Sequence, residues 1–134
     1  MANRNFSQRQ FSLERDVVNL FGDVTFGATG AVSAFKGLGL TSLTRTGVGA
    51  YTLTLNDAYV RLLGARVMFA KATSSGVAAV ELVDSHASVQ TDIKAKTVKF
   101  QCYDYAGAAV DPASGADAFI KLELRNTSVG PADF

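Results

Sequence analysis

The sequence contains few of the residues that build reactive or cross-linked sites. Its 134 residues include one cysteine, one histidine, two prolines and no tryptophan. The single cysteine, Cys102, excludes an internal disulfide, and nothing in the sequence points to an oxidising compartment. A chain of this length buries roughly two-thirds of its unfolded surface, so it can fold without disulfides or a metal.

Excess charge of one sign and long apolar runs are also scarce. Thirteen basic and twelve acidic residues give a net charge of +1. Non-specific electrostatic binding to nucleic acid requires a much larger excess of basic residues, so we expect no nucleic-acid partner. No apolar run approaches the roughly 20 residues of a membrane-spanning helix, and the first ten residues lack the apolar core of a signal peptide. We therefore expect no membrane partner.

Apolar residues in strand-like alternation are abundant. Tyr51, Leu53 and Leu55 alternate with alanine and threonine between the turn residues 47–49 and 56–57, a pattern typical of a half-buried antiparallel strand. Together with Leu40–Thr46 this strand predicts a hairpin. Shorter or similar patterns predict further strands at Val24–Phe26, Val32–Phe35, Leu63–Ala70, Val77–Val83, Ser88–Ile93, Thr97–Tyr105 and Ala118–Arg125.

The beginning of the chain has a different pattern. Residues 1–11 are mostly polar, with Arg4 and Arg9 beside Phe6 and Phe11, and predict an extended arm. A short helix is expected from the N-cap Ser12 to Gly22, with Leu13, Val17, Leu20 and Phe21 on one apolar stripe. We expect residues 1–22 to form this arm and helix, and residues 23–134 to form one β domain. The predicted fold is all-β, an antiparallel β-sandwich or small barrel with one short N-terminal helix.

Candidate reactive residues are isolated in the sequence. His86 next to Asp84 and Ser85 is interpreted as a turn residue rather than a proton-transfer group, because no nucleophile motif accompanies it. Cys102 shares a strand face with Val98 and Phe100 and is interpreted as a buried structural thiol. Three aspartates, at positions 104, 111 and 117, do not fit the spacing of a calcium loop and are interpreted as turn-capping residues. We therefore expect no enzyme activity, cofactor, metal or catalytic residue.

Two groups of residues suggest contacts with other chains. Arg4 and Arg9 in the arm could meet carboxylates on a partner, or could belong to an ordinary terminus. Tyr103, Tyr105 and Phe119 lie opposite the inward rows of their strands, so they either form a subunit interface or are buried within one domain. The sequence alone leaves both alternatives open.

Three stretches resemble a known class of proteins. They are Arg4–Phe6 followed by LERDVVNL at Leu13–Leu20, TRTGVGAYTLTLNDAYVRLL at Thr44–Leu63, and LELRNTS at Leu122–Ser128. Their order resembles small virion structural proteins of tailed bacteriophages, of the head decoration or cement type. The resemblance implies a homotrimer that is made in the host cytoplasm, binds the major capsid protein on the capsid surface of the virion and stabilises the head.

On this reading the residues that bind the capsid partner are Arg4, Phe6, Arg9, Phe11, Leu13 and Val17, and the subunit interface contains Tyr103, Tyr105 and Phe119. The alternative is a head-fibre, tail-fibre or adaptor module that binds another virion protein or a host receptor. Glycine turns and Thr/Leu strands are common to both kinds of protein. Virion copy number would distinguish them, because decoration requires hundreds of copies and a fibre or tail module a dozen or fewer.

Overall fold

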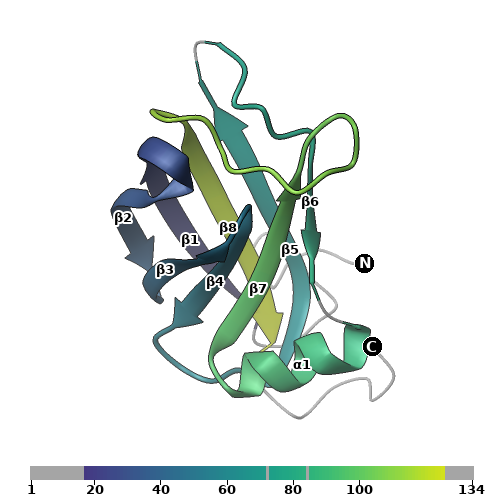
Figure 1. Ribbon diagram of the computed structural model, residues 1–134. Coiled ribbons are helices and arrows are strands. Elements are labelled where there is room, and N and C mark those ends of the chain that lie inside the picture. Colours follow the sequence, from purple (N-terminus) through teal and green to yellow (C-terminus); the bar gives the residue numbers. More distant parts are fainter. Residues whose placement is uncertain (1–16, 72, 84, 126–134) are drawn as a thin grey trace, which may run out of the picture.

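The computed structural model describes residues 17–71, 73–83 and 85–125 (Figure 1). In this part the chain is mostly strand, with one α-helix. The elements are β1 (Val17–Phe26), a 3-10 turn (Ala28–Gly30), β2 (Val32–Leu38), β3 (Leu40–Gly47), β4 (Ala50–Leu55), β5 (Arg61–Ala70), β6 (Ala79–Leu82), α1 (His86–Lys94), β7 (Thr97–Tyr103) and β8 (Asp117–Arg125).

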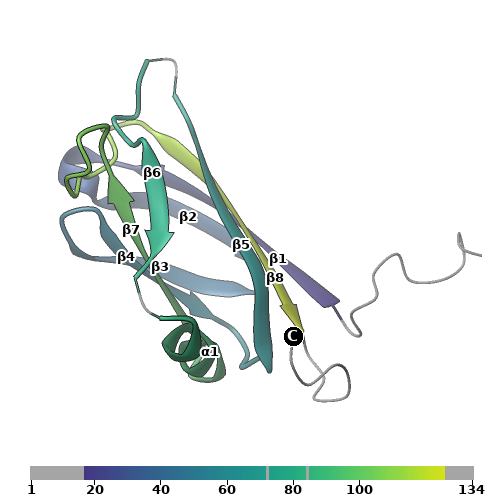
Figure 2. The same cartoon turned by 90° about the vertical axis from the view of Figure 1, so that its right-hand side faces the viewer.

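The strands form two four-stranded antiparallel sheets. One sheet has the order β2-β1-β8-β5 and the other β3-β4-β7-β6 (Figures 1 and 2). Their inner faces share one apolar core, because each central strand buries alternate residues; on β8 these are Ala118, Ile120, Leu122 and Leu124. The expected hairpin, the final strand and its inward row are confirmed.

Aromatic rings connect the two sheets across the core. Phe26 of β1 meets Tyr51 of β4 edge-on, with ring centroids 5.3 Å apart. Phe69 of β5 stacks on Phe26 at 5.8 Å, and Phe100 of β7 stacks on Tyr51 at 5.6 Å. Edge-on and offset ring pairs of this kind add to the gain from area burial alone. The Phe26–Tyr51 pair joins the two sheets, and Phe69 and Phe100 each extend the cluster within one sheet.

The helix expected at Ser12–Gly22 is wrong over residues 17–22, which form the first half of β1. Residues 12–16 lie outside the described part of the chain. Leu20, Gly22 and Val24 are buried and the two residues between them are exposed, so the period is 2 and not 3.6. β1 pairs with β8 along nine residues, including Leu20 with Leu122. This long-range pairing outweighs the helical spacing of Val17, Leu20 and Phe21.

The strand expected at Ser88–Ile93 is also wrong, because these residues belong to α1. Ser85 is the N-cap, and its hydroxyl accepts a hydrogen bond from the backbone N–H of Ser88. Val89 and Ile93 lie one turn apart and are buried in the core. Only these two apolar positions mark the buried face, so the helical period is faint in the sequence.

Candidate functional site

The residues singled out for chemistry occupy structural positions. Within residues 17–71, 73–83 and 85–125, no three His, Cys, Asp or Glu side chains are grouped so that they could hold a metal ion. His86 is exposed at the first position of α1. Cys102 is fully buried between the sheets, as its shared face with Val98 and Phe100 predicted. Burial raises the pKa of the Cys102 thiol to about 12, so the unreactive protonated form dominates at neutral pH.

The three aspartates each have a different local partner. Asp104 accepts hydrogen bonds from the backbone N–H groups of Ala106 and Ala108, which confirms a turn-capping role. Asp117 accepts a hydrogen bond of 2.7 Å from the Thr25 hydroxyl across the β1–β8 pair. Asp111 forms a bidentate contact with Arg45, described below.

Asp111 anchors the loop before β8 to the β3–β4 hairpin. Arg45 donates through Nε at 3.0 Å and through Nη2 at 2.8 Å to the two carboxylate oxygens. The backbone N–H of Gly49 donates to the same carboxylate at 2.7 Å. These donors, with the Arg45 guanidinium as the main cause, hold the pKa of Asp111 below its ordinary value. The Asp111 carboxylate therefore has a structural role.

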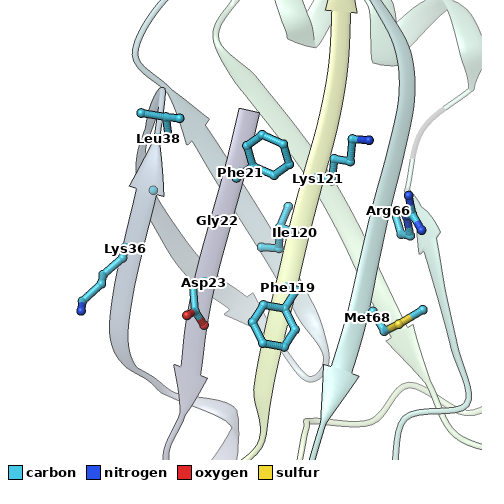
Figure 3. A pocket seen from close by; sticks show the side chains of 11 residues that line it. Phe21, Gly22, Asp23, Lys36, Leu38, Arg66, Met68, Phe119, Ile120 and Lys121 are labelled. Atoms are coloured by element: carbon cyan, nitrogen blue, oxygen red, sulfur yellow. The ribbon is translucent and has the colours of Figure 1, made fainter. Parts of the chain in front are cut away.

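The surface most suited to a partner is the outer face of the β2-β1-β8-β5 sheet. Strand register places two outward rows side by side across the four strands. One row runs Leu38, Phe21, Lys121, Arg66 and the next runs Lys36, Asp23, Phe119, Met68. Figure 3 shows these side chains together on one side of the sheet. We call these eight residues the outer patch.

The centre of the outer patch is apolar and open. The exposed fractions are 48% for Phe21, 69% for Leu38, 60% for Met68 and 54% for Phe119. A shallow hollow of about 540 Å³ lies among them. Single exposed apolar residues are ordinary on a protein surface, but four of them converging on one sheet face are typical of a binding surface.

Cations predominate around this apolar centre. Lys36, Arg66 and Lys121 line the hollow together with a single acid, Asp23. A second carboxylate, that of Glu123, lies 3.9 Å from the Lys121 ammonium. The long stems of lysine and arginine cover apolar surface while their charged ends stay in water. The rim is thus suited to a partner that carries carboxylates around an apolar contact.

Two glycines keep this face of the sheet close to the core. Gly22 and Gly37 are paired across β1 and β2. A Cβ atom on Gly22 would lie 2.9 Å from the Cδ1 atom of Leu40, and one on Gly37 would lie 2.7 Å from the Leu40 Cβ atom. At Gly37 a Cβ atom would thus require Leu40 itself to shift, whereas at Gly22 only the end of the Leu40 side chain would have to move. The adjacent residues Phe21 and Leu38 project outward.

Comparison with protein families, curated proteins and solved structures gave no match for this chain. In the described residues, no helix is long and apolar enough to cross a membrane. Function is therefore inferred from the surface itself.

The residues predicted for contacts fall on separate surfaces. Phe119 is part of the outer patch, whereas Tyr103 ends β7 in the opposite sheet and Tyr105 follows it with 85% of its surface exposed. The two tyrosines line another hollow with Ala78, Ala79 and Glu81. Val17 begins β1 and pairs with Arg125. The remaining predicted capsid contacts, Arg4, Phe6, Arg9, Phe11 and Leu13, lie outside the described residues.

Three apolar members of the outer patch were not singled out from the sequence. Phe21 had been assigned to a helical stripe, and Leu38 lay outside any expected strand. Met68 lay within the expected strand Leu63–Ala70 but was not assigned to either face of it. Exposed apolar residues gather here only because β1 and β2 lie beside β8 and β5, which are distant from them in the sequence.

Proposed function

We propose that this protein is a structural β-sandwich module that binds another protein through the outer patch. In the setting that the phage resemblance implies, it is a decoration or cement protein and the partner is the major capsid protein. The observation that supports this proposal is the convergence of four exposed apolar side chains with a mainly cationic rim. The apolar centre would be desolvated on binding, and the rim would orient the carboxylates of the partner.

The energetics of such a contact favour many copies that each bind weakly over a single copy that binds tightly. Full burial of a large apolar side chain contributes about 1.5–3 kcal/mol, so the half-exposed residues of the outer patch each have about 1 kcal/mol left to gain. The total of about 4 kcal/mol is at the lower end of what association costs in lost freedom. Repetition over a closed shell compensates for this weakness by avidity, as a cement protein requires.

The direct test is binding to capsids assembled without this protein. Phe119→Lys places a charge at the centre of the outer patch but leaves the core untouched, so the variant should fold and bind at least tenfold more weakly. Val48→Lys is the matched control, because Val48 is 55% exposed in the β3–β4 turn of the other sheet. Equal binding by wild type and Phe119→Lys would exclude the outer patch as the attachment surface.

The fibre or adaptor alternative uses the same kind of surface in a different place. Quantitative mass spectrometry of purified virions distinguishes the two. Hundreds of copies per particle support decoration, whereas a dozen or fewer support a fibre, tail or adaptor position.

A further inference from the structure

The strand β5 forms one edge of its sheet, and α1 covers only the beginning of this edge. Gln90 of α1 bonds to Leu62 through both ends of its side-chain amide: its Oε1 accepts from the Leu62 N–H at 2.8 Å, and its Nε2 donates to the Leu62 carbonyl at 3.1 Å. This amide offers the donor and acceptor that a neighbouring strand would supply. From Gly64 to Ala70, no strand of the described chain lies beside β5 on this side.

The pairing of β5 with β8 shows which backbone groups face outward along this edge. Leu62 pairs with an even-numbered residue of β8, and its N–H and C=O point away from β8 to α1. Bonding alternates residue by residue between the two neighbours of a strand, so all even-numbered residues of β8 have this orientation. After the bulge between Leu62 and Gly64, they pair with Ala65, Val67 and Phe69. The N–H and C=O groups of these three residues therefore also point away from β8.

The inner side of the edge opens into the space between the two sheets. Ala65 is exposed and Val67 is half-buried, although both face inward and their β8 neighbours are almost fully buried. A cavity of about 260 Å³ opens between β5 and β6 at this side of the molecule (Figure 2). Ala65 and Val67 line it from one sheet, and Val80 and Leu82 line it from the other. Apolar side chains beside β5 would fill this space.

The outer side of the same edge is cationic. Arg66 is exposed on the outer face (Figure 3) and has no ion-pair partner among the described residues. Lys71 directly follows the strand and is exposed, and β5 itself contains no acidic residue. The two acids on the outer face of β8 already have partners: Asp117 bonds to a hydroxyl of β1, and Glu123 lies 3.9 Å from a lysine ammonium. An acid beside β5 would therefore meet a cation that is not neutralised.

We propose that β5 binds an extended segment of another protein along Gly64–Ala70, as an added strand in which apolar and acidic side chains alternate. The outward backbone groups of Ala65, Val67 and Phe69 bond to this strand. Its apolar side chains face inward and enter the cavity between β5 and β6. Its acidic side chains face outward, one of them opposite Arg66. Because Arg66 bonds to β8, this is a non-hydrogen-bonded pair with the new strand, in which side chains lie closest.

The charge of the edge selects this occupant. Opposite charges on facing positions of neighbouring strands stabilise the pairing, and like charges destabilise it. A second copy of β5 would bring its own Arg66 to the edge. The arm at residues 1–11 contains two arginines and no acid, so it is also unfavourable here. An acidic segment is complementary to the edge. This binding goes beyond the capsid role proposed above and does not rest on it, because its test contains no capsid.

Synthetic peptides test the chemistry of the occupant on the full-length protein. The probe is a fluorescein-labelled heptapeptide with blocked ends, in which four valines alternate with three glutamates. By fluorescence anisotropy it should bind at least tenfold more tightly than the same peptide with lysines in place of the glutamates. It should also bind at least tenfold more tightly than the peptide with serines in place of the valines. Failure of the valine–glutamate peptide to bind, or equal binding by either control peptide, overturns the proposal.

A charge reversal tests the contact with Arg66. Arg66→Glu should weaken binding of the glutamate peptide at least tenfold and strengthen binding of the lysine peptide. Lys36→Glu is the matched control, an equal reversal at an exposed position of β2, the opposite edge of the sheet. It lies three strands away, about 14 Å, beyond the screening length of about 8 Å at physiological salt, and should bind both peptides like wild type. Equal effects of the two substitutions overturn the assignment to β5.

Amide hydrogen exchange measured by NMR locates the added strand. In the free protein, the amides of Ala65, Val67 and Phe69 should exchange faster than those of Arg66 and Met68, which bond to β8. Saturation with the glutamate peptide should slow exchange at the first three positions at least tenfold. The outward amides of β2 should exchange at an unchanged rate. Binding without protection of Ala65, Val67 and Phe69, or with equal protection on β2, overturns strand addition at β5.

Discussion

At the scale of single residues, a few close contacts organise the end of the molecule where the loops gather. Gly30 has a positive φ of 74°, and its carbonyl accepts the Tyr51 hydroxyl at 2.6 Å. A Cβ atom on Gly30 would lie 2.5 Å from the Oδ1 atom of Asp111. The backbone bend, the buried tyrosine and the Asp111 carboxylate therefore depend on one another.

We predict that Gly30→Ala is far more destabilising than Gly76→Ala. Both positions have positive φ, 74° and 80°, so both substitutions carry the same backbone cost of about 1 kcal/mol. A Cβ atom on Gly76 would meet nothing within 4 Å, so only Gly30→Ala must also displace Asp111. Thermal denaturation of the two variants measures the difference. Equal losses in melting temperature would show that the contact with Asp111 relaxes freely.

We predict that Cys102 is inert in the native protein. Its thiol is fully buried and its pKa is raised to about 12, mainly by burial, so at pH 8 the reactive thiolate is scarce as well as inaccessible. Labelling with a thiol reagent should be slow in buffer and fast in denaturant. Cys102→Ser should cost about 1–3 kcal/mol, because it places a hydroxyl in an apolar site. Rapid native labelling would contradict this placement.

At the scale of elements, the sequence predicts strands well where apolar and polar residues alternate clearly and turn residues flank the segment. The β3–β4 hairpin and β8 are visible in the sequence because each has a clear period of 2 and turn residues at its ends. β1 could not be distinguished from a helix, because Val17, Leu20 and Phe21 also fit helical spacing and the strand that pairs with all of them, β8, lies at the other end of the chain. α1 was missed because only Val89 and Ile93 mark its buried face.

The contact between α1 and β5 gives a prediction at this scale. Gln90→Ala removes both hydrogen bonds to Leu62 and should lower the free energy of unfolding by about 1–3 kcal/mol, because the Leu62 groups lose their partners. Thr91→Ala on the same helix is the control. Thr91 is exposed and its hydroxyl bonds only back to the Ala87 carbonyl, so this change should be neutral or slightly stabilising. Urea unfolding of both variants provides the comparison.

At the scale of the whole molecule, the outer patch could not be predicted from the sequence. Phe21, Leu38, Met68 and Phe119 come from four strands, and only the register of the complete sheet brings them together. Local alternation shows that a side chain points outward, but it does not show which outward residues are neighbours. The arm, by contrast, was proposed from composition alone, and the molecule has two candidate attachment regions, the arm and the outer patch.

The salt dependence of capsid binding measures how much the charges of the outer patch contribute to it. Lys36→Ala/Arg66→Ala removes two cations that line the hollow, and Lys94→Ala/Lys96→Ala removes the same charge from exposed positions at the end of α1. We predict that the first variant binds capsids severalfold more weakly than wild type at low salt and that the difference shrinks at high salt, because ions screen exposed charges. The second variant should bind like wild type. If both variants lose the same affinity, overall net charge and not the outer patch governs attachment.

The same capsid-binding assay tests whether the arm contributes to attachment in addition to the outer patch. Deleting residues 2–11 should leave the melting temperature of the two-sheet domain nearly unchanged. If the arm and the outer patch both contact the capsid, Phe119→Lys and the deletion each weaken binding, and the combined variant binds more weakly than either. The weakening by Phe119→Lys should persist at high salt, because it reflects apolar contact as well as charge. A deletion variant that decorates capsids as well as the full chain would remove the arm from the mechanism, leaving the outer patch as the attachment surface.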